Sequence, residues 1–193
     1  PDWRKVLREN AEAGYTGIDL GPVGFMPEDP PQVSEALDDF GQTRIGGVVF
    51  RPFHDPDAWD DVLDGSVRTC KALVAHGSQH LVLIDSISPR RAPTAGRADA
   101  AEQMDAAEWT AYRDRLAQVA KMGAEEYGLT VGIHAHAAGF MDFEPELIRL
   151  LDEVDEKILK ICFDTGHHSY AGFDPVSFME RYIGRISYMH FKD

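Results

Sequence analysis

A helix-like segment followed by a strand-like segment recurs six times along this chain, and this alternation constrains the fold more than any other feature. The helical segments end at glycines such as Gly14, Gly77 and Gly128, and the longest is expected over residues 102–127. The expected strands are residues 16–20, 44–50, 80–85, 129–136, 159–164 and 186–191. Such alternation with short connections predicts an α/β fold in which a parallel sheet is covered by helices.

Two architectures accommodate these strands: an open doubly wound sheet, and a (β/α)8 TIM barrel that lacks its first strand and its last unit. The barrel is favoured because the chain begins directly on the helix-like residues 3–13 and ends on the polar strand end 190–193. No change of composition divides the chain, so residues 1–193 are expected to form a single barrel domain, truncated at both ends. The one long loop, residues 86–101, is expected to border the active site.

Composition excludes several classes of function. The 33 acidic residues outnumber the 19 basic ones, and a net charge of −14 disfavours binding to a nucleic-acid backbone. No apolar run is long enough to span a membrane, no secretory signal pattern is visible, and two cysteines suit a reducing compartment. We therefore expect a cytoplasmic protein that acts on a small molecule. A homo-oligomer is one expected state, because a barrel lacking strands exposes sheet edges.

Polar residues gather where the expected strands end, and parallel α/β folds place their chemistry at these carboxyl ends. Five of the eight histidines follow the last three strands. Because side chains alternate along a strand, His134 and His136 share one face, and Asp164 and His190 likewise oppose apolar neighbours that include Phe191. The apolar set is expected to face the helices, so the polar set converges on one interior surface.

A divalent cation would hold such a cluster together, since unpaired polar groups are costly to bury. Asp164 and His190, with His134 or His136, would form a mixed oxygen and nitrogen shell that suits Mn²⁺, Co²⁺, Zn²⁺ or Mg²⁺. We take His134 as the ligand and His136 as a substrate contact, and we expect His54, after the strand at 44–50, to line the substrate site. Asp164 has a second interpretation, as a cap for the turn after its strand.

The Asp164-Thr165-Gly166-His167 motif, followed by His190-Phe191-Lys192-Asp193, resembles the paired motifs of the xylose-isomerase-like TIM barrels, the superfamily of sugar isomerases and epimerases. Residues 13–22 and 132–136 extend the resemblance over nearly the whole chain, and it is strongest to the inosose dehydratases of inositol catabolism. The resemblance implies a metal-dependent barrel in which Asp164 and His190 are ligands and His167 is a histidine on the substrate side.

The implied reaction is the removal of water from 2-keto-myo-inositol through an enediolate that a divalent metal, with Mn²⁺ or Co²⁺ favoured, would stabilise. A base removes the proton α to the ketone and an acid protonates the departing hydroxyl. His167 and Lys192 are the expected catalytic residues, whereas His136, His54 and Asp193 are expected to contact a cyclic polyol or sugar. A histidine of the strand at 129–136 is the alternative to His167 for one proton transfer, and Lys192 would either bind substrate oxygens or donate to the leaving group. The alternative is a sugar isomerase or 3-epimerase on the same barrel.

Three positions depart from the family pattern. Related epimerases carry a glutamate where this chain has His134 and His136, and the last glutamate ligand would lie beyond Asp193. Asp19 stands where the dehydratase pattern has glutamate. A DNA-repair phosphodiesterase of the same superfamily is disfavoured by the acidic charge, and a sugar-binding protein without activity stays an alternative.

Overall fold

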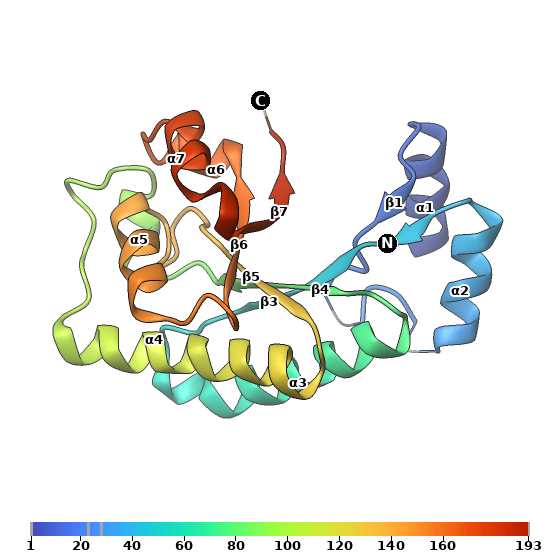
Figure 1. Cartoon of the computed structure of the whole chain (residues 1–193), viewed down its shortest axis with the longest axis horizontal. Helices are drawn as coiled ribbons and strands as arrows, with labels where there is room; N and C mark the ends of the chain where they lie inside the picture. Colours follow the sequence, from blue (N-terminus) through green and yellow to red (C-terminus); the bar gives the residue numbers. More distant parts are fainter. Residues whose placement is uncertain (1, 23, 28, 193) are drawn as a thin grey trace.

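The computed structural model describes residues 2–22, 24–27 and 29–192, and its strands are all parallel (Figure 1). A two-stranded sheet has the order β1-β2 and a five-stranded sheet the order β3-β4-β5-β6-β7. The strands are β1 (Gly17–Ile18), β2 (Thr43–Arg44), β3 (Gly46–Arg51), β4 (His80–Asp85), β5 (Thr130–His134), β6 (Lys160–Asp164) and β7 (Ile186–His190). The predicted alternation and parallel sheet are therefore confirmed.

The expected strand at 44–50 is divided into β2 and β3 at Ile45. Its backbone N–H donates to the carbonyl of Ile18 at 3.1 Å, and the N–H of Leu20 donates to the carbonyl of Gly46 at 2.8 Å. These two hydrogen bonds continue the parallel pairing from one sheet to the other. The six predicted strands thus correspond to seven observed ones.

The helices form three groups around the strands: α3 and α4 along one face of the five-stranded sheet, α5 to α7 near β6 and β7, and α1 and α2 beside β1 and β2 (Figure 1). They are α1 (Trp3–Glu12), α2 (Pro30–Asp39), α3 (Trp59–Ala75), α4 (Ala106–Lys121), α5 (Glu144–Glu153), α6 (Thr165–Tyr170) and α7 (Pro175–Tyr182). The helix expected over 102–127 begins later, because Asp105 and Glu108 form a capping box, and it continues past Lys121 as one wider turn, Met122–Glu126. The short α6 was not predicted.

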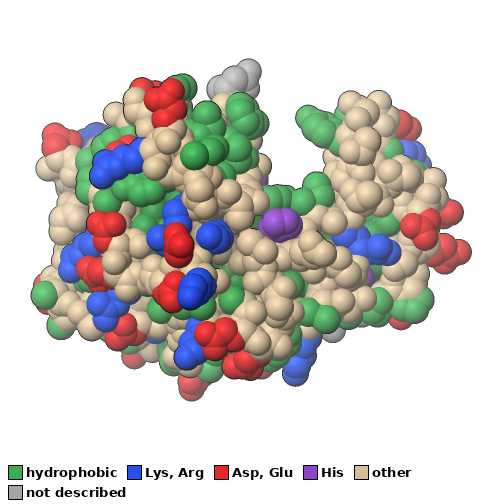
Figure 2. Space-filling view, in the orientation of Figure 1, with side chains coloured by type: hydrophobic (Ala, Val, Ile, Leu, Met, Phe, Trp, Pro, Cys, Tyr) green, Lys and Arg blue, Asp and Glu red, His purple; other side chains and the backbone are tan. Residues whose placement is uncertain are grey.

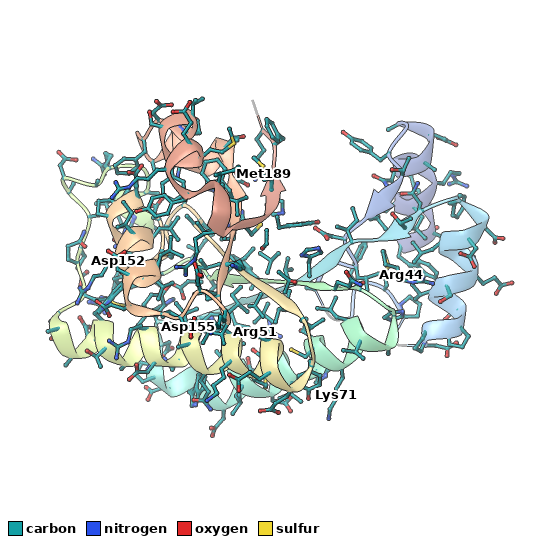
Figure 3. The ribbon with its side chains drawn as sticks, in the orientation of Figure 1. Arg44, Arg51, Lys71, Asp152, Asp155 and Met189 are labelled. Atoms are coloured by element: carbon teal, nitrogen blue, oxygen red, sulfur yellow. The ribbon has the colours of Figure 1, made fainter. Side chains whose placement is uncertain are left out.

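The core has two layers, one on each face of the five-stranded sheet. Leu81, Leu83 and Ile133 belong to a large cluster that packs against the helices. On the other face, Val82 and Ile84 pack with a small set that includes Cys162, Val48 and Tyr188. This alternation confirms the predicted assignment of strand faces. Charged side chains such as Lys71 of α3 and Asp152 of α5 are exposed (Figure 3).

Phe191 is a correction to that assignment. It was expected to face the helices together with Met189, but it is 80% exposed. The reason is that β7 ends at His190, so the alternation of faces no longer applies to the next residue. Met189, which lies inside β7, packs against the large cluster as expected (Figure 3).

A hydrogen bond joins the last strand to the region of the first. The hydroxyl of Tyr188 in β7 donates to Oδ1 of Asp19, directly after β1, at 2.8 Å. Figure 2 shows a hollow between the part of the molecule with α5 to α7 and the part with α1 and α2, and a histidine side chain lies at its base. Among the described residues, no helix combines the length and apolarity needed to cross a membrane.

Candidate metal and substrate site

Asp164 is the centre of a polar cluster at the carboxyl end of β6. The residue is 4% exposed. Its Oδ2 lies 3.1 Å from Nε2 of His134, 3.3 Å from Nδ1 of His190 and 2.5 Å from Nζ of Lys192. His134 lies in β5, His190 in β7, and Lys192 just after β7. The strands β5 and β7 pair with β6 on either side. Parallel pairing therefore gathers the cluster, as the strand ends predicted.

The residue types of Asp164, Thr165 and Gly166 each serve a local contact. Oδ1 of Asp164 accepts from the N–H of His167 at 2.8 Å and caps α6. The hydroxyl of Thr165 donates to the carbonyl of Lys192 at 2.8 Å and accepts from its N–H at 2.9 Å. A Cβ on Gly166 would lie 2.8 Å from that of Lys192, so glycine permits this close approach. Asp164 thus serves as a helix cap through one oxygen and as the centre of the polar cluster through the other.

The electrostatics favour an ionised Asp164 beside a neutral His134. Burial raises the pKa of Asp164, but hydrogen bonds from His134, His190 and Lys192 outweigh burial and hold that pKa well below its usual range. Burial also lowers the pKa of His134, which is 1% exposed. A neutral imidazole with a free lone pair is the form that ligates metals.

His136 and His167 complete the cluster. The ring centroid of His167 lies 5.2 Å from that of His134 and 4.4 Å from that of His136. Burial, followed by the nearby charges of His136 and His134, lowers the pKa of His167 to about 4. Nδ1 of His167 accepts from the N–H of Ala137 at 3.2 Å, whereas Nδ1 of His136 donates to the carbonyl of Ala137 at 2.9 Å. When neutral, His167 therefore carries its proton on Nε2, and His136 has its lone pair there.

The donor atoms of this cluster fit a divalent cation. His134, Asp164 and His167 each offer one ligand atom, and these three atoms all lie within 4.8 Å of one another. His190 is not in that group of three, although its Nδ1 is close to Oδ2 of Asp164. Several nitrogen donors around one buried carboxylate oxygen form the mixed shell that Mn²⁺, Co²⁺, Zn²⁺ or Mg²⁺ accepts. In the structure, the positive charge closest to Oδ2 of Asp164 among these partners is the ammonium of Lys192.

His54 has other partners among the described residues. Its Nδ1 contacts Oδ1 of Asp85 at 2.8 Å, its backbone N–H donates to the same oxygen at 3.2 Å, and its ring packs on Phe140. The side chain is 11% exposed. Asp193, the other predicted substrate contact, lies outside the described residues. The structure thus brings together His134, His136, Asp164, His167, His190 and Lys192. It pairs His54 with Asp85, and the role of His54 in lining the substrate site stays a prediction.

Two aspartates were missed as supports of the site. Asp85, 1% exposed, accepts from His54 through Oδ1 and from the N–H of Phe140 through Oδ2 at 2.9 Å. Asp142, 2% exposed, accepts from the N–H of Ala138 at 3.0 Å. Asp85 did end a predicted strand and could have been found by that signal. Asp142 lies in a loop with no recognisable pattern.

Parallel strands covered by helices, with a carboxylate and histidines at the carboxyl ends of the strands, are typical of α/β barrel enzymes, whose active sites lie at those ends. The sequence model of the xylose isomerase-like TIM barrel matches residues 7–193, and the chain belongs to that family. This match confirms both the predicted fold and the resemblance on which the sequence analysis relied.

Several known proteins are similar to this chain. An inosose dehydratase from Geobacillus kaustophilus is 28% identical over 98% of this chain and 61% of its own length. The probable 3-DHS dehydratase AsbF from Bacillus anthracis has a similar structure, with a TM-score of 0.78, 20% identity, and coverage of 100% of this chain and 68% of that one. The IOLI protein, solved with a zinc atom, has a TM-score of 0.75 and 13% identity, covering 99% and 67%. The chain thus spans about three-fifths of the length of the Geobacillus relative.

Proposed function

We propose that this chain belongs to a divalent-metal-dependent hydro-lyase that removes water from an inosose such as 2-keto-myo-inositol. The observation that carries the proposal is the convergence of His134, His190 and Lys192 on one oxygen of the buried, ionised Asp164. The substrate class is supported by the similarity to the Geobacillus inosose dehydratase along nearly the whole chain.

Asp164, His134 and His190 would hold the metal ion, for which we propose Mn²⁺ or Co²⁺. We choose His190 over His167 because its Nδ1 lies 3.3 Å from Oδ2 of Asp164, whereas the neutral ring of His167 carries its proton on Nε2. When bound, the ion would supply Lewis acidity to the ketone oxygen of the substrate. The similar IOLI protein was solved with a bound zinc atom, which supports a divalent ion as the cofactor, and the identity of the ion is part of the test.

The remaining residues of the cluster would bind the substrate and move protons. An open pocket next to Asp164 is lined by Ala137, Gly166, His167, Tyr170 and Lys192, and a small polyol would enter there. His136 has a lone pair on Nε2 and would take the proton α to the ketone. The ammonium of Lys192 would donate a proton to the β-hydroxyl, so that the C–O bond breaks and water leaves.

The test uses the full-length protein, stripped of metal and then supplied with Mn²⁺, Co²⁺ or Zn²⁺ alone. Formation of the dione from 2-keto-myo-inositol is followed, with Asp164→Asn as the variant and Asp152→Asn, an exposed aspartate of α5, as the matched control. We expect metal-dependent turnover that Asp164→Asn abolishes and Asp152→Asn retains. Metal binding without turnover would refute the proposed substrate and favour a sugar isomerase or 3-epimerase.

A further inference from the structure

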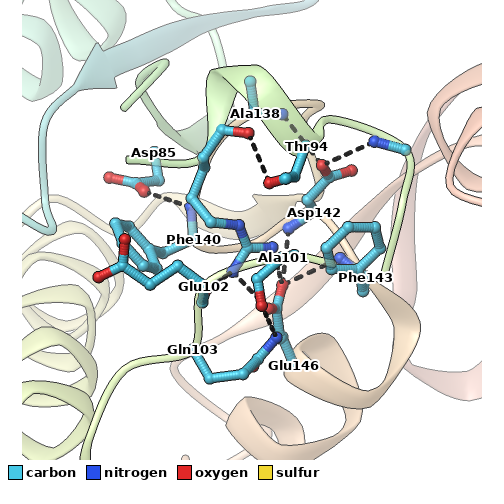
Figure 4. Close-up of polar contacts among 12 residues, drawn as sticks. Asp85, Thr94, Ala101, Glu102, Gln103, Ala138, Phe140, Asp142, Phe143 and Glu146 are labelled. Carbon is cyan, nitrogen blue, oxygen red and sulfur yellow. Dashed lines mark hydrogen bonds and ion pairs between the residues drawn. The ribbon is translucent and has the colours of Figure 1, made fainter. Parts of the chain in front are cut away.

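The loop that follows β5, here residues 135–143, is anchored to several separate elements (Figure 4). The N–H of Phe140 donates to Asp85 at the end of β4. The N–H of Asp142 donates to Oε2 of Glu146, in the first turn of α5, at 3.0 Å. Glu146 in turn forms an ion pair with the buried Arg91 of the 86–101 loop, at 2.8 Å. The path of this loop is therefore fixed by its surroundings.

Asp142 holds the tightest part of the loop. Its Oδ2 accepts from the N–H of Ala138 at 3.0 Å and from the N–H of Gly96, in the 86–101 loop, at 3.5 Å (Figure 4). Ala138 has a φ of 68°, and it is the one non-glycine residue with positive φ in the described part of the chain. A residue with a Cβ avoids this conformation unless its surroundings enforce it. The carboxylate of Asp142 is placed to enforce it.

Ala138, the residue with positive φ, directly follows the residue whose backbone N–H contacts His167. Ala137, directly before Ala138, donates its N–H to Nδ1 of His167. The carbonyl of His136, which shares a peptide group with the Ala137 N–H, accepts from the N–H of Gly139 at 3.1 Å and so closes a turn around Ala137 and Ala138. The positive φ of Ala138 belongs to this turn, so the orientation of the Ala137 N–H depends on the turn being kept. A histidine whose Nδ1 accepts a hydrogen bond carries its proton on Nε2 when neutral, and that nitrogen then has no lone pair for a metal.

We propose that Asp142 is a positioning residue for His167. By holding the turn at Ala138, Asp142 keeps the Ala137 N–H on Nδ1 and so keeps His167 in the Nε2–H tautomer. His167 then acts as a hydrogen-bond donor towards a substrate oxygen and is not a metal ligand, although its ring lies within reach of His134 and Asp164. The substrate oxygen rests on the proposed function, whereas the tautomer can be measured without substrate.

The measurement is nitrogen NMR of the full chain, metal-free and labelled with ¹⁵N-histidine, with His167→Gln used to assign the His167 signals. We expect the Nε2–H tautomer in the natural protein. Asp142→Ala should give a mixture of tautomers, whereas Asp142→Asn, which keeps an oxygen acceptor for both amides, should retain the Nε2–H form. Asp99→Ala, at an exposed aspartate of the 86–101 loop, is the matched control and should change nothing.

A second variant separates positioning from general damage to the fold. Glycine adopts positive φ without a steric penalty, so Ala138→Gly added to Asp142→Ala should shift the tautomer back towards Nε2–H. Where Asp142→Ala does not fold, Ala137→Pro removes the N–H donor itself and should abolish the tautomer preference. An Nδ1–H tautomer in the natural protein, or an unchanged one in Asp142→Ala or Ala137→Pro, would overturn the proposal.

Metal binding and turnover complete the test. His167→Gln should bind one metal ion as the natural protein does, and loss of that ion would overturn the assignment of His167 as a donor. Turnover should fall about 10- to 100-fold in Asp142→Ala and stay near the natural value in Asp142→Asn. An Nε2–H tautomer in a protein that does not dehydrate inosose would refute the proposed function but leave the positioning role intact.

Discussion

The ion pair between Arg91 and Glu146 should contribute far more to stability than the neighbouring pair between Arg90 and Glu102. Arg91 is 1% exposed, contacts both oxygens of Glu146 at 2.8 and 3.3 Å, and packs its guanidinium on the ring of Phe143. Removing Glu146 would leave this cation buried without its partner, which costs about 3–5 kcal/mol. The N–H groups that donate to Glu146 would also lose their acceptor.

The assay is urea unfolding of the full chain at neutral pH. We expect Glu146→Ala to lower the free energy of unfolding by about 4 kcal/mol. Glu146→Gln, which keeps an acceptor oxygen for the amides, should cost less. The matched control is Glu102→Ala, whose side chain is 49% exposed and whose pair with Arg90 is worth about 1 kcal/mol or less. Equal losses from Glu146→Ala and Glu102→Ala would refute this reasoning, because burial would then not be what makes the pair important.

Three further predictions concern the site. The pKa of His167 is about 4 in the folded protein and 6.5 in an unperturbed histidine, so the unfolded state binds more protons between these two values. The free energy of unfolding should therefore fall as the pH drops from 6.5 to 4. Urea titrations should show a weaker pH dependence in His167→Gln than in the natural protein. Lys192→Met removes the cation that competes for Asp164, so chelator competition should show tighter metal binding, while turnover falls about 100-fold or more; weaker metal binding would contradict this. Ala138→Gly alone should raise the free energy of unfolding by up to about 1 kcal/mol, since glycine relieves the positive φ, and a lower thermal midpoint would contradict this.

The fold was predictable because its signals are periodic. Alternating apolar residues such as Val131 and Ile133 fix which face of a strand meets the helices, and parallel pairing fixes which strand ends meet. The same two rules predict that His134, Asp164 and His190 lie close together, and the structure has both histidines in contact with Asp164. The rules stop where the strands stop, and so they failed for Phe191, one residue after β7.

The short helix α6 was not predicted because local capping contacts, and no periodic pattern, determine it. The helix α6 has six residues, too few to display a helical repeat, and it exists because Asp164 caps its first turn and Thr165 ties it to the end of β7. Neither interaction leaves a periodic signature. A residue that acts both as a cap and as the centre of a polar site looks the same in sequence as one that has either role alone.

The choice between His167 and His190 as the third metal ligand depends on a backbone group, the N–H of Ala137, which no pattern of side chains predicts. His167 and His190 both lie near Asp164, and their residue type is the same. What distinguishes them is the hydrogen bond from the Ala137 amide to Nδ1 of His167, and that amide is oriented by an alanine, not a glycine, at positive φ. Because an alanine gives no signal of such a turn, the choice between a donor role and a ligand role follows only from the backbone. Asp142, which holds that backbone, thereby helps to decide the chemistry of a histidine that it does not contact.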